Sequence, residues 1–328
     1  MVYLLCSRVT YSLDLDYIHN YIYKVQGVSY DITLCIQSST ENRNMTSAEY
    51  VYEDGKFEVT DKMKEDFDNY GYIMVRKLLD TAELQKVKEV LENSDEITKH
   101  AYGLPDGSGR ECKMVLWSHP GNDVTGMVVR CEKVVDTTEK LLGGEVYHYH
   151  TKFNMKEPQT GGSFLWHQDY GYWYKNGCLF PDMSTVFLAI DKCNKANGCL
   201  QILRGSHKCG RIEHLMIAGQ TRADVDRIKE IEKMCPMEYV EMEAGDALFF
   251  HCNLLHTSGP NNSDLRRWAF VTAYNTKANN PVIPHHHPQY TPLDKVPNSA
   301  IRDCTNMTDM TGKEFLNPAI DKTVKARA

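Results

Sequence analysis

A histidine and an aspartate separated by one residue are the most distinctive potential metal ligands in this sequence, His167 and Asp169. If they lie in a strand, residues two apart share a face, so the imidazole and the carboxylate can reach a common centre. Two further histidines, His251 and His256, follow downstream. One of them would complete a set of two histidines and one carboxylate, which holds Fe(II) and leaves coordination positions open.

The residues that follow His256 favour it over His251 as the third ligand. Ser258 and Arg267 come two and eleven residues after it. An arginine on the next strand can form a bidentate pair with a carboxylate, and a serine hydroxyl can add a hydrogen bond. Such a pair suits a dicarboxylate co-substrate whose other end chelates the metal. His251 lies an odd number of residues before His256, so a regular strand would turn it to the opposite face.

Three blocks of sequence, in order, carry a resemblance to a known family. They are residues 167–169, 197–208 and 245–267. On these blocks the sequence resembles the phytanoyl-CoA dioxygenase family of Fe(II)/2-oxoglutarate-dependent oxygenases, from about Phe57 to the C-terminal region. Within that family it is most similar to the ectoine hydroxylase and free L-proline hydroxylase-like branch, through residues 164–173 and 149–156.

The resemblance implies a mainly β protein with flanking helices and a double-stranded β-helix, a cupin-like jelly-roll core. It implies that His167, Asp169 and His256 hold Fe(II), with 2-oxoglutarate and O₂ as co-substrates and ascorbate as reductant. Arg267 and Ser258 would then bind the distal carboxylate of 2-oxoglutarate. The remaining contacts implied for 2-oxoglutarate come from Asn154 and Phe164.

The substrate contacts are also expectations from the resemblance. Trp173 and Phe250 match positions that line the substrate site in ectoine hydroxylases. Lys152 falls where those enzymes carry an arginine for the substrate carboxylate, and a lysine keeps the charge but loses the planar fork. Strand alternation puts His150 on the same face as Lys152 and Asn154, so it either contacts the substrate or packs in the core. With Tyr170, these residues would offer a cation, a polar contact and aromatic walls to a small anionic molecule.

The elements that must position these residues are short strands. Clusters of Gly, Asn and Pro separate the candidate strands, which is typical of a sandwich or jelly roll with its core at about 145–275. One helical insertion is expected at 222–234. The candidate strands are 146–155, 164–167, 185–190, 200–203, 239–242, 246–252 and 268–274.

Upstream of this core the pattern is mixed. A short helix is expected around residues 63–70, then a strand at 72–75. A capping box at 80–83 indicates the start of an amphipathic helix. Residues 102–126 are rich in Gly and Pro and are expected to form a long loop.

Two domains are expected. Residues 1–55 lack sustained periodicity and end in a polar stretch, which predicts a partly disordered extension. Residues 56–328 are expected to form the dioxygenase domain, with irregular Pro-rich structure after 276. In that last region His285-His-His287 is expected to lie in a surface or lid loop, whereas His207 is expected to stabilise a turn.

The amino-acid composition argues against nucleic acid and membranes as binding partners. The chain has 328 residues and a formal net charge of −7, which gives no general attraction to nucleic acid or anionic membranes. No apolar run approaches the length of a membrane span. The 11 cysteines include no C-x-x-C pair, so they are expected to be small buried residues in a reducing compartment. The first residues lack the pattern of a secretory signal, which favours the cytoplasm. A monomer or homodimer is expected.

These expectations combine into one predicted reaction. The protein would hydroxylate a C–H bond of a small amino acid or amino-acid-like substrate, proline-like by preference, and release succinate and CO₂. A phytanoyl-CoA-type acyl-CoA hydroxylase and a non-catalytic binding or sensing member of the fold are the alternatives. A halogenase would need the carboxylate ligand replaced, and Asp169 argues against that.

Overall fold

The computed structural model describes residues 24–25, 28–29, 48–93, 95–217 and 219–319. The chain divides into two compact units, Met1–Thr46 and Ser47–Ala328. In the first unit, β1 (Lys24–Val25) pairs with β2 (Val28–Ser29) in antiparallel fashion. Most of the predicted 1–55 extension lies outside the described residues, so its partial disorder stays a prediction.

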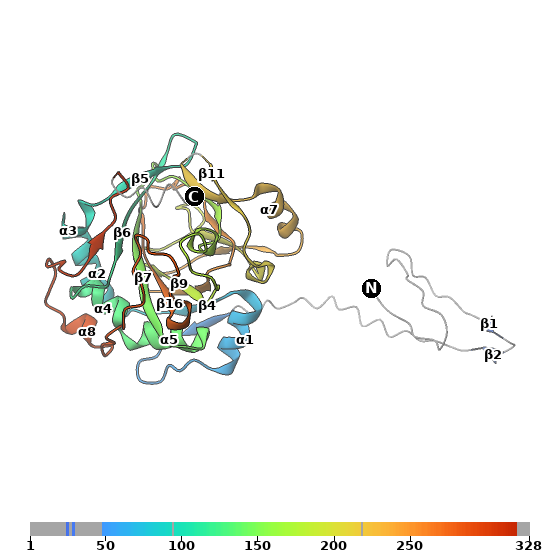
Figure 1. Cartoon of the computed structure of the whole chain (residues 1–328), viewed down its shortest axis with the longest axis horizontal. Coiled ribbons are helices and arrows are strands. Elements are labelled where there is room, and N and C mark those ends of the chain that lie inside the picture. Colours follow the sequence, from blue (N-terminus) through green and yellow to red (C-terminus); the bar gives the residue numbers. More distant parts are fainter. Residues whose placement is uncertain (1–23, 26–27, 30–47, 94, 218, 320–328) are drawn as a thin grey trace. The chain divides into compact units, whose positions relative to one another are not determined.

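A large sheet forms one wall of the second unit (Figure 1). It includes β3, which runs parallel to β4, so the residues just before position 55 contribute to this sheet. β5 (Tyr102–Pro105) extends it by pairing with β6. In sheet order, the other strands are β17 (Glu314–Phe315), β6 (Glu111–Ser118), β7 (Val146–Lys156), β16 (Arg267–Thr276), β9 (Met183–Ala189), β14 (Ala247–His251), β4 (Tyr72–Arg76) and β3 (Glu49–Val51).

A smaller sheet forms the opposite wall. Its neighbouring strands come from distant parts of the chain, and a cavity between the two sheets is lined by residues of both. This arrangement confirms the predicted jelly-roll core. In order, its strands are β13 (Met237–Val240), β10 (Leu200–Leu203), β15 (His256–Ser258) and β8 (Phe164–His167).

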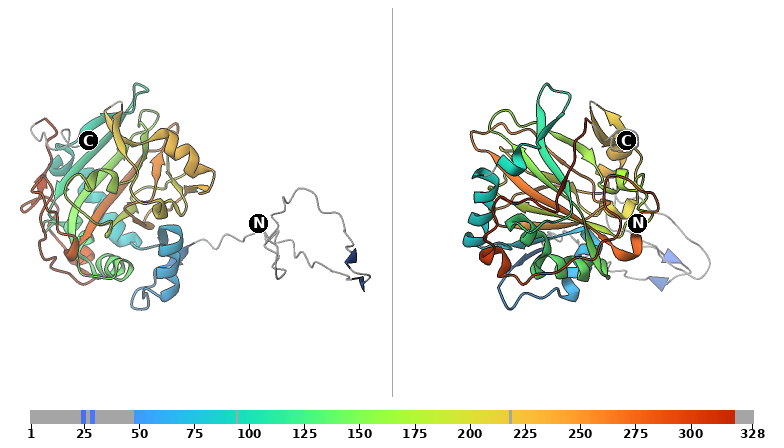
Figure 2. Two further views of the ribbon diagram at one scale, coloured as in Figure 1. Left: turned by 45° about the vertical axis from the view of Figure 1, so that its right-hand side comes forward. Right: turned by 60° about the vertical axis from the view of Figure 1, so that its left-hand side comes forward.

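Helices cover the outer side of the large sheet, where α5 packs against β7, β9 and β16 (Figures 1 and 2). None of the helices in the described ranges is long and apolar enough to cross a membrane. The helices are α1 (Asp61–Tyr70), α2 (Thr81–Asn93), α3 (Asp95–Thr98), α4 (Val124–Arg130), α5 (Glu132–Leu142), α6 (Tyr170–Trp173), α7 (Val225–Glu232) and α8 (Ala300–Asp303), with 3₁₀ turns η1 (Ser206–Cys209) and η2 (Lys277–Asn279).

Local signals in the sequence explain the ends of the first two long helices. Thr60 accepts a hydrogen bond from the Met63 amide, and Gly71 ends α1 with a φ of 83°, a left-handed conformation that glycine adopts without strain. The predicted capping box is confirmed before α2. Asp80 accepts from the amide of Glu83 (3.0 Å), whose carboxylate accepts from the amide of Asp80 (3.0 Å).

The long loop predicted at 102–126 is wrong, because β5 and β6 form a hairpin there. Most of its Gly and Pro residues lie in two turns, 106–110 and 119–123, and the residues between them pair with β7. A second hairpin was also missed, β11 (His214–Ile217) with β12 (Gln220–Ala223). The insertion predicted at 222–234 is therefore a hairpin followed by the shorter helix α7.

Candidate active site

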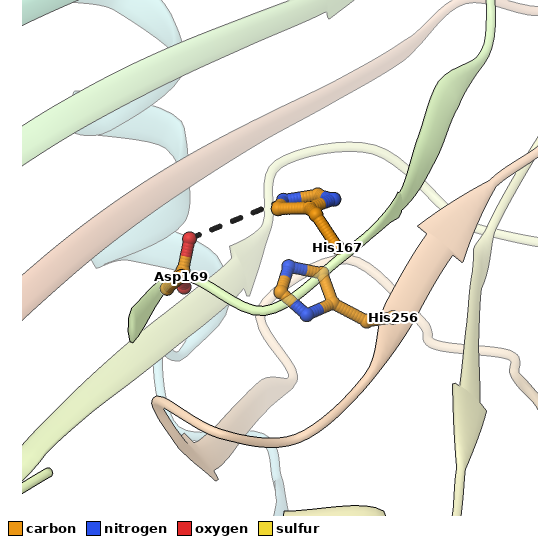
Figure 3. A group of neighbouring side chains, drawn as sticks. All are labelled: His167, Asp169 and His256. Carbon is orange, nitrogen blue, oxygen red and sulfur yellow. Dashed lines mark ion pairs between the residues drawn. The ribbon is translucent and has the colours of Figure 1, made fainter. Parts of the chain in front are cut away.

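Strand register places two of the predicted metal ligands directly opposite each other. β15 pairs with β8 so that His256 faces His167, and their ring centroids lie 4.1 Å apart (Figure 3). Opposite residues of an antiparallel pair project to the same face. Residues 89 positions apart in the chain are therefore neighbours because of one backbone pairing.

Asp169 lies close to the two histidines, but the backbone conformation that places it there differs from the expected one. β8 ends at His167, and Asp169 has helical backbone angles (φ −57°, ψ −41°) at the start of α6. The expectation that a continuing strand aligns Asp169 with His167 is therefore wrong, because the chain turns into a helix between them. One ligand atom from each of the three residues still lies within 4.8 Å of the others. The Asp169 Oδ1 atom is 4.0 Å from His167 Nε2 (Figure 3).

Each histidine has its ring fixed by a backbone carbonyl. His167 Nδ1 lies 2.7 Å from the Leu165 oxygen, and His256 Nδ1 lies 2.9 Å from the Leu254 oxygen. A carbonyl only accepts, so Nδ1 carries the proton and Nε2 keeps its lone pair. Burial lowers the pKa of both imidazoles, that of His167 well below its usual range, which keeps them neutral. Neutral imidazoles with a free Nε2 are suited to bind a metal ion.

The Asp169 carboxylate is ionised and oriented by three neighbours. Its Oδ2 accepts from the Thr185 hydroxyl at 2.7 Å, and its Oδ1 accepts from the Tyr172 hydroxyl at 2.8 Å. Lys152 Nζ lies 3.7 Å from Oδ1. Burial raises the pKa of Asp169, but the charge of Lys152 and the hydrogen bond from Thr185 outweigh it, so the pKa lies below its usual range. Thr185 and Tyr172 carried no signal in the sequence.

A cavity of about 240 Å³ lies beside these three residues. It brings together most of the residues predicted to contact co-substrate or substrate. These are His150, Lys152, Asn154, Phe164, Phe250, Ser258 and Arg267.

One end of the cavity is built for an anion. The Arg267 side chain is only 1% exposed, and its Nε and one terminal nitrogen have no hydrogen-bond partner among the described residues. The Ser258 hydroxyl and the Asn154 side-chain oxygen are likewise without partners there. A buried cation without a partner is costly, so the arrangement fits a bound carboxylate.

Lys156 is a second buried basic residue beside Arg267; it does not line the cavity, and it was not singled out in the sequence. It lies directly opposite Arg267 in the pairing of β7 with β16. Its Nζ donates to the backbone oxygens of Ser258 (3.3 Å) and Gly259. Burial and the charge of Arg267 lower the pKa of Lys156 well below its usual range, which favours the neutral amine. Lys156 comes two residues after Asn154 and therefore lies on the same strand face, which could have indicated that its side chain is buried near the predicted co-substrate contacts.

The other side of the cavity holds the expected substrate contacts of β7. Lys152 Nζ donates to the Tyr172 hydroxyl at 3.0 Å. His150 stacks on His287, with ring centroids 4.6 Å apart. The three-histidine tract was expected in a surface or lid loop. It lies in a loop, but not wholly at the surface, because His286 and His287 line the cavity and His287 is only 5% exposed. The reason is that this segment packs against β7, where Tyr149 contacts the His287 ring.

Two predicted substrate residues are not brought to the cavity. Tyr170 and Trp173 are buried but are not among the residues that line it. α6 forms a single helical turn after Asp169, so successive side chains point in different directions. Tyr172 takes the inward position, whereas Trp173 packs on Tyr149 with ring centroids 5.4 Å apart.

The histidines expected to be structural have local partners. His207 Nε2 donates to the Asp68 oxygen at 2.9 Å, in a turn as expected. His251 accepts from the Asn253 amide at 3.0 Å and is not part of the ligand group. All cysteines in the described ranges are free and none belongs to that group.

The family model of phytanoyl-CoA dioxygenase matches residues 67–269, more than half of the chain. The chain belongs to the phytanoyl-CoA dioxygenase family. The matched segment contains the histidine pair, Asp169 and the residues of the anion end of the cavity.

Characterised relatives and solved structures support the same fold. L-proline trans-4-hydroxylase from Streptomyces griseoviridis is 27% identical over 69% of this chain and 90% of its own length. Ectoine dioxygenase from Streptomyces coelicolor is 27% identical over 67% of this chain and 79% of its length. EctD from S. alaskensis, solved with bound Fe, covers 76% of this chain and 92% of its own, with a TM-score of 0.62 and 18% identity. Its structure with 2-oxoglutarate and 5-hydroxyectoine covers 78% and 91%, with a TM-score of 0.60 and 19% identity.

Proposed function

We propose that this protein is an Fe(II)- and 2-oxoglutarate-dependent dioxygenase. It hydroxylates a C–H bond of a small amino acid or amino-acid-like substrate, a proline-like one by preference, and releases succinate and CO₂. The observation that carries the proposal is the His167–Asp169–His256 group beside the buried Arg267, two of whose guanidinium nitrogens have no hydrogen-bond partner among the described residues. A metal ligand set next to an anion site matches the two ends of a chelating dicarboxylate.

His167, Asp169 and His256 are the residues that would hold Fe(II). Two neutral imidazoles with free Nε2 atoms and one ionised carboxylate fit this ion, and they leave other positions open to co-substrates. When bound, the iron supplies the activation of O₂ that is coupled to oxidation of 2-oxoglutarate, with ascorbate as reductant. The protein keeps the imidazoles neutral and the carboxylate oriented before the ion binds.

Arg267 and Ser258 would hold the distal carboxylate of 2-oxoglutarate. The guanidinium is fixed at the first position of β16, and the hydroxyl projects from the last position of β15. Asn154 offers a further polar atom, and Phe164 lies opposite Ser258 in the sheet as an apolar wall. These contacts orient the co-substrate so that its other end points toward the ligand group.

The substrate would bind on the β7 side, where Lys152 supplies a cation and His150 a polar contact. Phe250 adds an aromatic wall next to His256, with ring centroids 4.9 Å apart. The relative named L-proline trans-4-hydroxylase supports a small cyclic amino acid as the first candidate.

The volume of the cavity favours a small substrate over an acyl-CoA. About 240 Å³ lies below the roughly 300–1,000 Å³ of pockets for drug-sized ligands. A non-catalytic binding role is less well supported, because the ligand group and the anion end are both complete. The cytoplasmic location and the monomeric or homodimeric state stay predictions.

The test is a screen of amino acids with the full-length protein, Fe(II), 2-oxoglutarate and ascorbate, read out as succinate formation and product mass. We expect succinate and a product 16 mass units heavier from a proline-like substrate, since one oxygen atom is added. His167→Ala should abolish both signals. Undiminished turnover in that variant would refute the metal assignment, and turnover with acyl-CoA thioesters alone would refute the substrate class.

A further inference from the structure

Gln168 lies between two of the ligand residues, and its side chain points away from the cavity into the protein. It is fully buried, at 0% exposed. Its Nε2 donates to two backbone oxygens, those of Gly210 and Asn253, both at 2.8 Å. Its Oε1 accepts from the Ile212 amide at 2.7 Å. Three hydrogen bonds to backbone groups make this side chain a fixed link between separate segments of the chain.

The segments it links are those that carry the ligand group. Gln168 itself belongs to the segment with His167 and Asp169, whereas Asn253 precedes His256 by three residues. Gly210 and Ile212 belong to the loop between η1 and β11. The Gln168 side-chain amide therefore sets the distance between the segment with His167 and Asp169 and the segment with His256, on the side remote from the cavity.

The elements on either side of this loop, η1 and β11, also contact the two ligand-bearing segments. The backbone N–H of Gln168 donates to His214 Nε2 at 2.8 Å, and His214 Nδ1 donates to the Ile212 backbone oxygen at 2.7 Å. On the other side, the Ser206 hydroxyl accepts from the Leu255 amide at 2.9 Å. Residues 206–214 thus hold the backbone next to His167 and next to His256.

We propose that Gln168 is a positioning residue, which fixes the spacing of His167, Asp169 and His256 before any ligand binds. The inference rests on the proposed function, because positioning matters only if these residues bind a metal. Only a side-chain amide satisfies all three backbone partners. The carbonyl oxygens of Gly210 and Asn253 need donors, and the N–H of Ile212 needs an acceptor. A carboxylate would offer no donors, and an apolar side chain would leave three buried backbone groups without partners.

The test measures binding of Ni(II) to metal-free full-length protein by isothermal titration calorimetry. Gln168→Met keeps the size of the side chain and removes all three hydrogen bonds. We expect its Ni(II) affinity to fall by about 10–100-fold, the usual effect of losing a group that orients metal ligands. If Gln168→Met does not fold, Gln168→Glu keeps the acceptor and loses both donors, and we expect a loss of the same kind.

Asn279 provides a matched control. It is 2% exposed and also donates twice, to the Phe180 oxygen (2.6 Å) and the Asn275 side chain (2.9 Å), and accepts once, from the Phe180 amide (2.9 Å). Asn279→Leu should lower the melting temperature as Gln168→Met does and change Ni(II) affinity by less than about twofold. An equal loss of affinity in Asn279→Leu would overturn the inference, because general destabilisation would then explain it.

The remaining outcomes separate this inference from the proposed function. If wild type binds Ni(II), His167→Ala does not, and folded Gln168 variants bind as wild type does, the positioning role alone is refuted. If wild type binds no Ni(II), or His167→Ala binds as tightly, the metal centre is refuted and the positioning role with it.

Discussion

At the scale of single residues, Arg267 makes the sharpest test of the anion end. Its guanidinium is buried at the start of β16, and its Nε and one terminal nitrogen have no hydrogen-bond partner among the described residues. Arg267→Met removes a charged hydrogen-bonding group, which contributes about 1.5–3 kcal/mol. We expect the KM for 2-oxoglutarate to rise at least tenfold, measured from initial rates of succinate formation.

The adjacent Arg266 is the control for that change. Its Nε donates to Asp191 at 3.0 Å, and it lies outside the cavity. Arg266→Met should leave the KM for 2-oxoglutarate within about twofold of wild type. A similar rise in both variants would show that Arg267 acts on stability and not on the co-substrate.

Lys152 tests the substrate side of the cavity. Its Nζ contacts Tyr172 and lies near Asp169, but it lines the region assigned to the substrate. Lys152→Ala should raise the KM for an acidic substrate more than the KM for 2-oxoglutarate, because it removes the cation that would meet the substrate carboxylate. Equal increases in the two constants would count against that role.

At the scale of elements, the contact of α6 with β11 depends on a glycine. A Cβ on Gly171 would lie 2.1 Å from the His214 ring, so the helix or the ring would have to move. We expect Gly171→Ala to lower the free energy of unfolding by about 1–3 kcal/mol, as overpacking in a core does. Urea unfolding followed by circular dichroism measures this.

Gly144 is the matched glycine for comparison. A Cβ there would meet nothing within 4 Å. Gly144→Ala should therefore change the free energy of unfolding by less than about 0.5 kcal/mol, as surface substitutions usually do. If the two variants were equally stable, the close packing of α6 on His214 would be contradicted.

At the scale of the whole molecule, buried neutral histidines make stability depend on pH. Burial lowers the pKa of His148 to about 3 and that of His214 to about 4. An unfolded histidine has a pKa of about 6.5, so below that pH the unfolded state binds more protons and the free energy of unfolding falls. We expect each of the two to contribute a loss of about 1 kcal/mol between pH 7 and pH 5.5. Urea unfolding at both pH values would detect it, and a pH-independent free energy would contradict it.

The boundary between the two compact units, after Thr46, predicts which N-terminal truncations the domain tolerates. Every residue assigned to the site lies after position 47, and β3 begins at Glu49. A protein lacking residues 1–46 should keep wild-type 2-oxoglutarate turnover. Removing residues 1–55 also removes β3 and exposes the edge of β4, which should lower the melting temperature by a few degrees. Equal melting temperatures for the two truncations would show that β3 adds nothing to the domain.

Most strands of the core could be predicted because their signals are local. β8 was predicted with the bounds it has, and β7 within one residue, since alternation and flanking turns lie within each segment. β6 was missed because the turns on either side of it hold the Gly and Pro residues that suggested a loop. β15 is only three residues long, too short for any periodicity.

Residue types and spacings were enough to predict the chemistry, from two histidines, an aspartate and an arginine within a known family's motifs. How these residues meet depends on the folded chain. The pairing of β15 with β8 sets His256 against His167, and the turn into α6 gives Asp169 and Tyr172 the inward positions instead of Tyr170 and Trp173. Side-chain direction at a strand–helix junction depends on where the strand ends, and backbone pairing over 89 residues has no local signature.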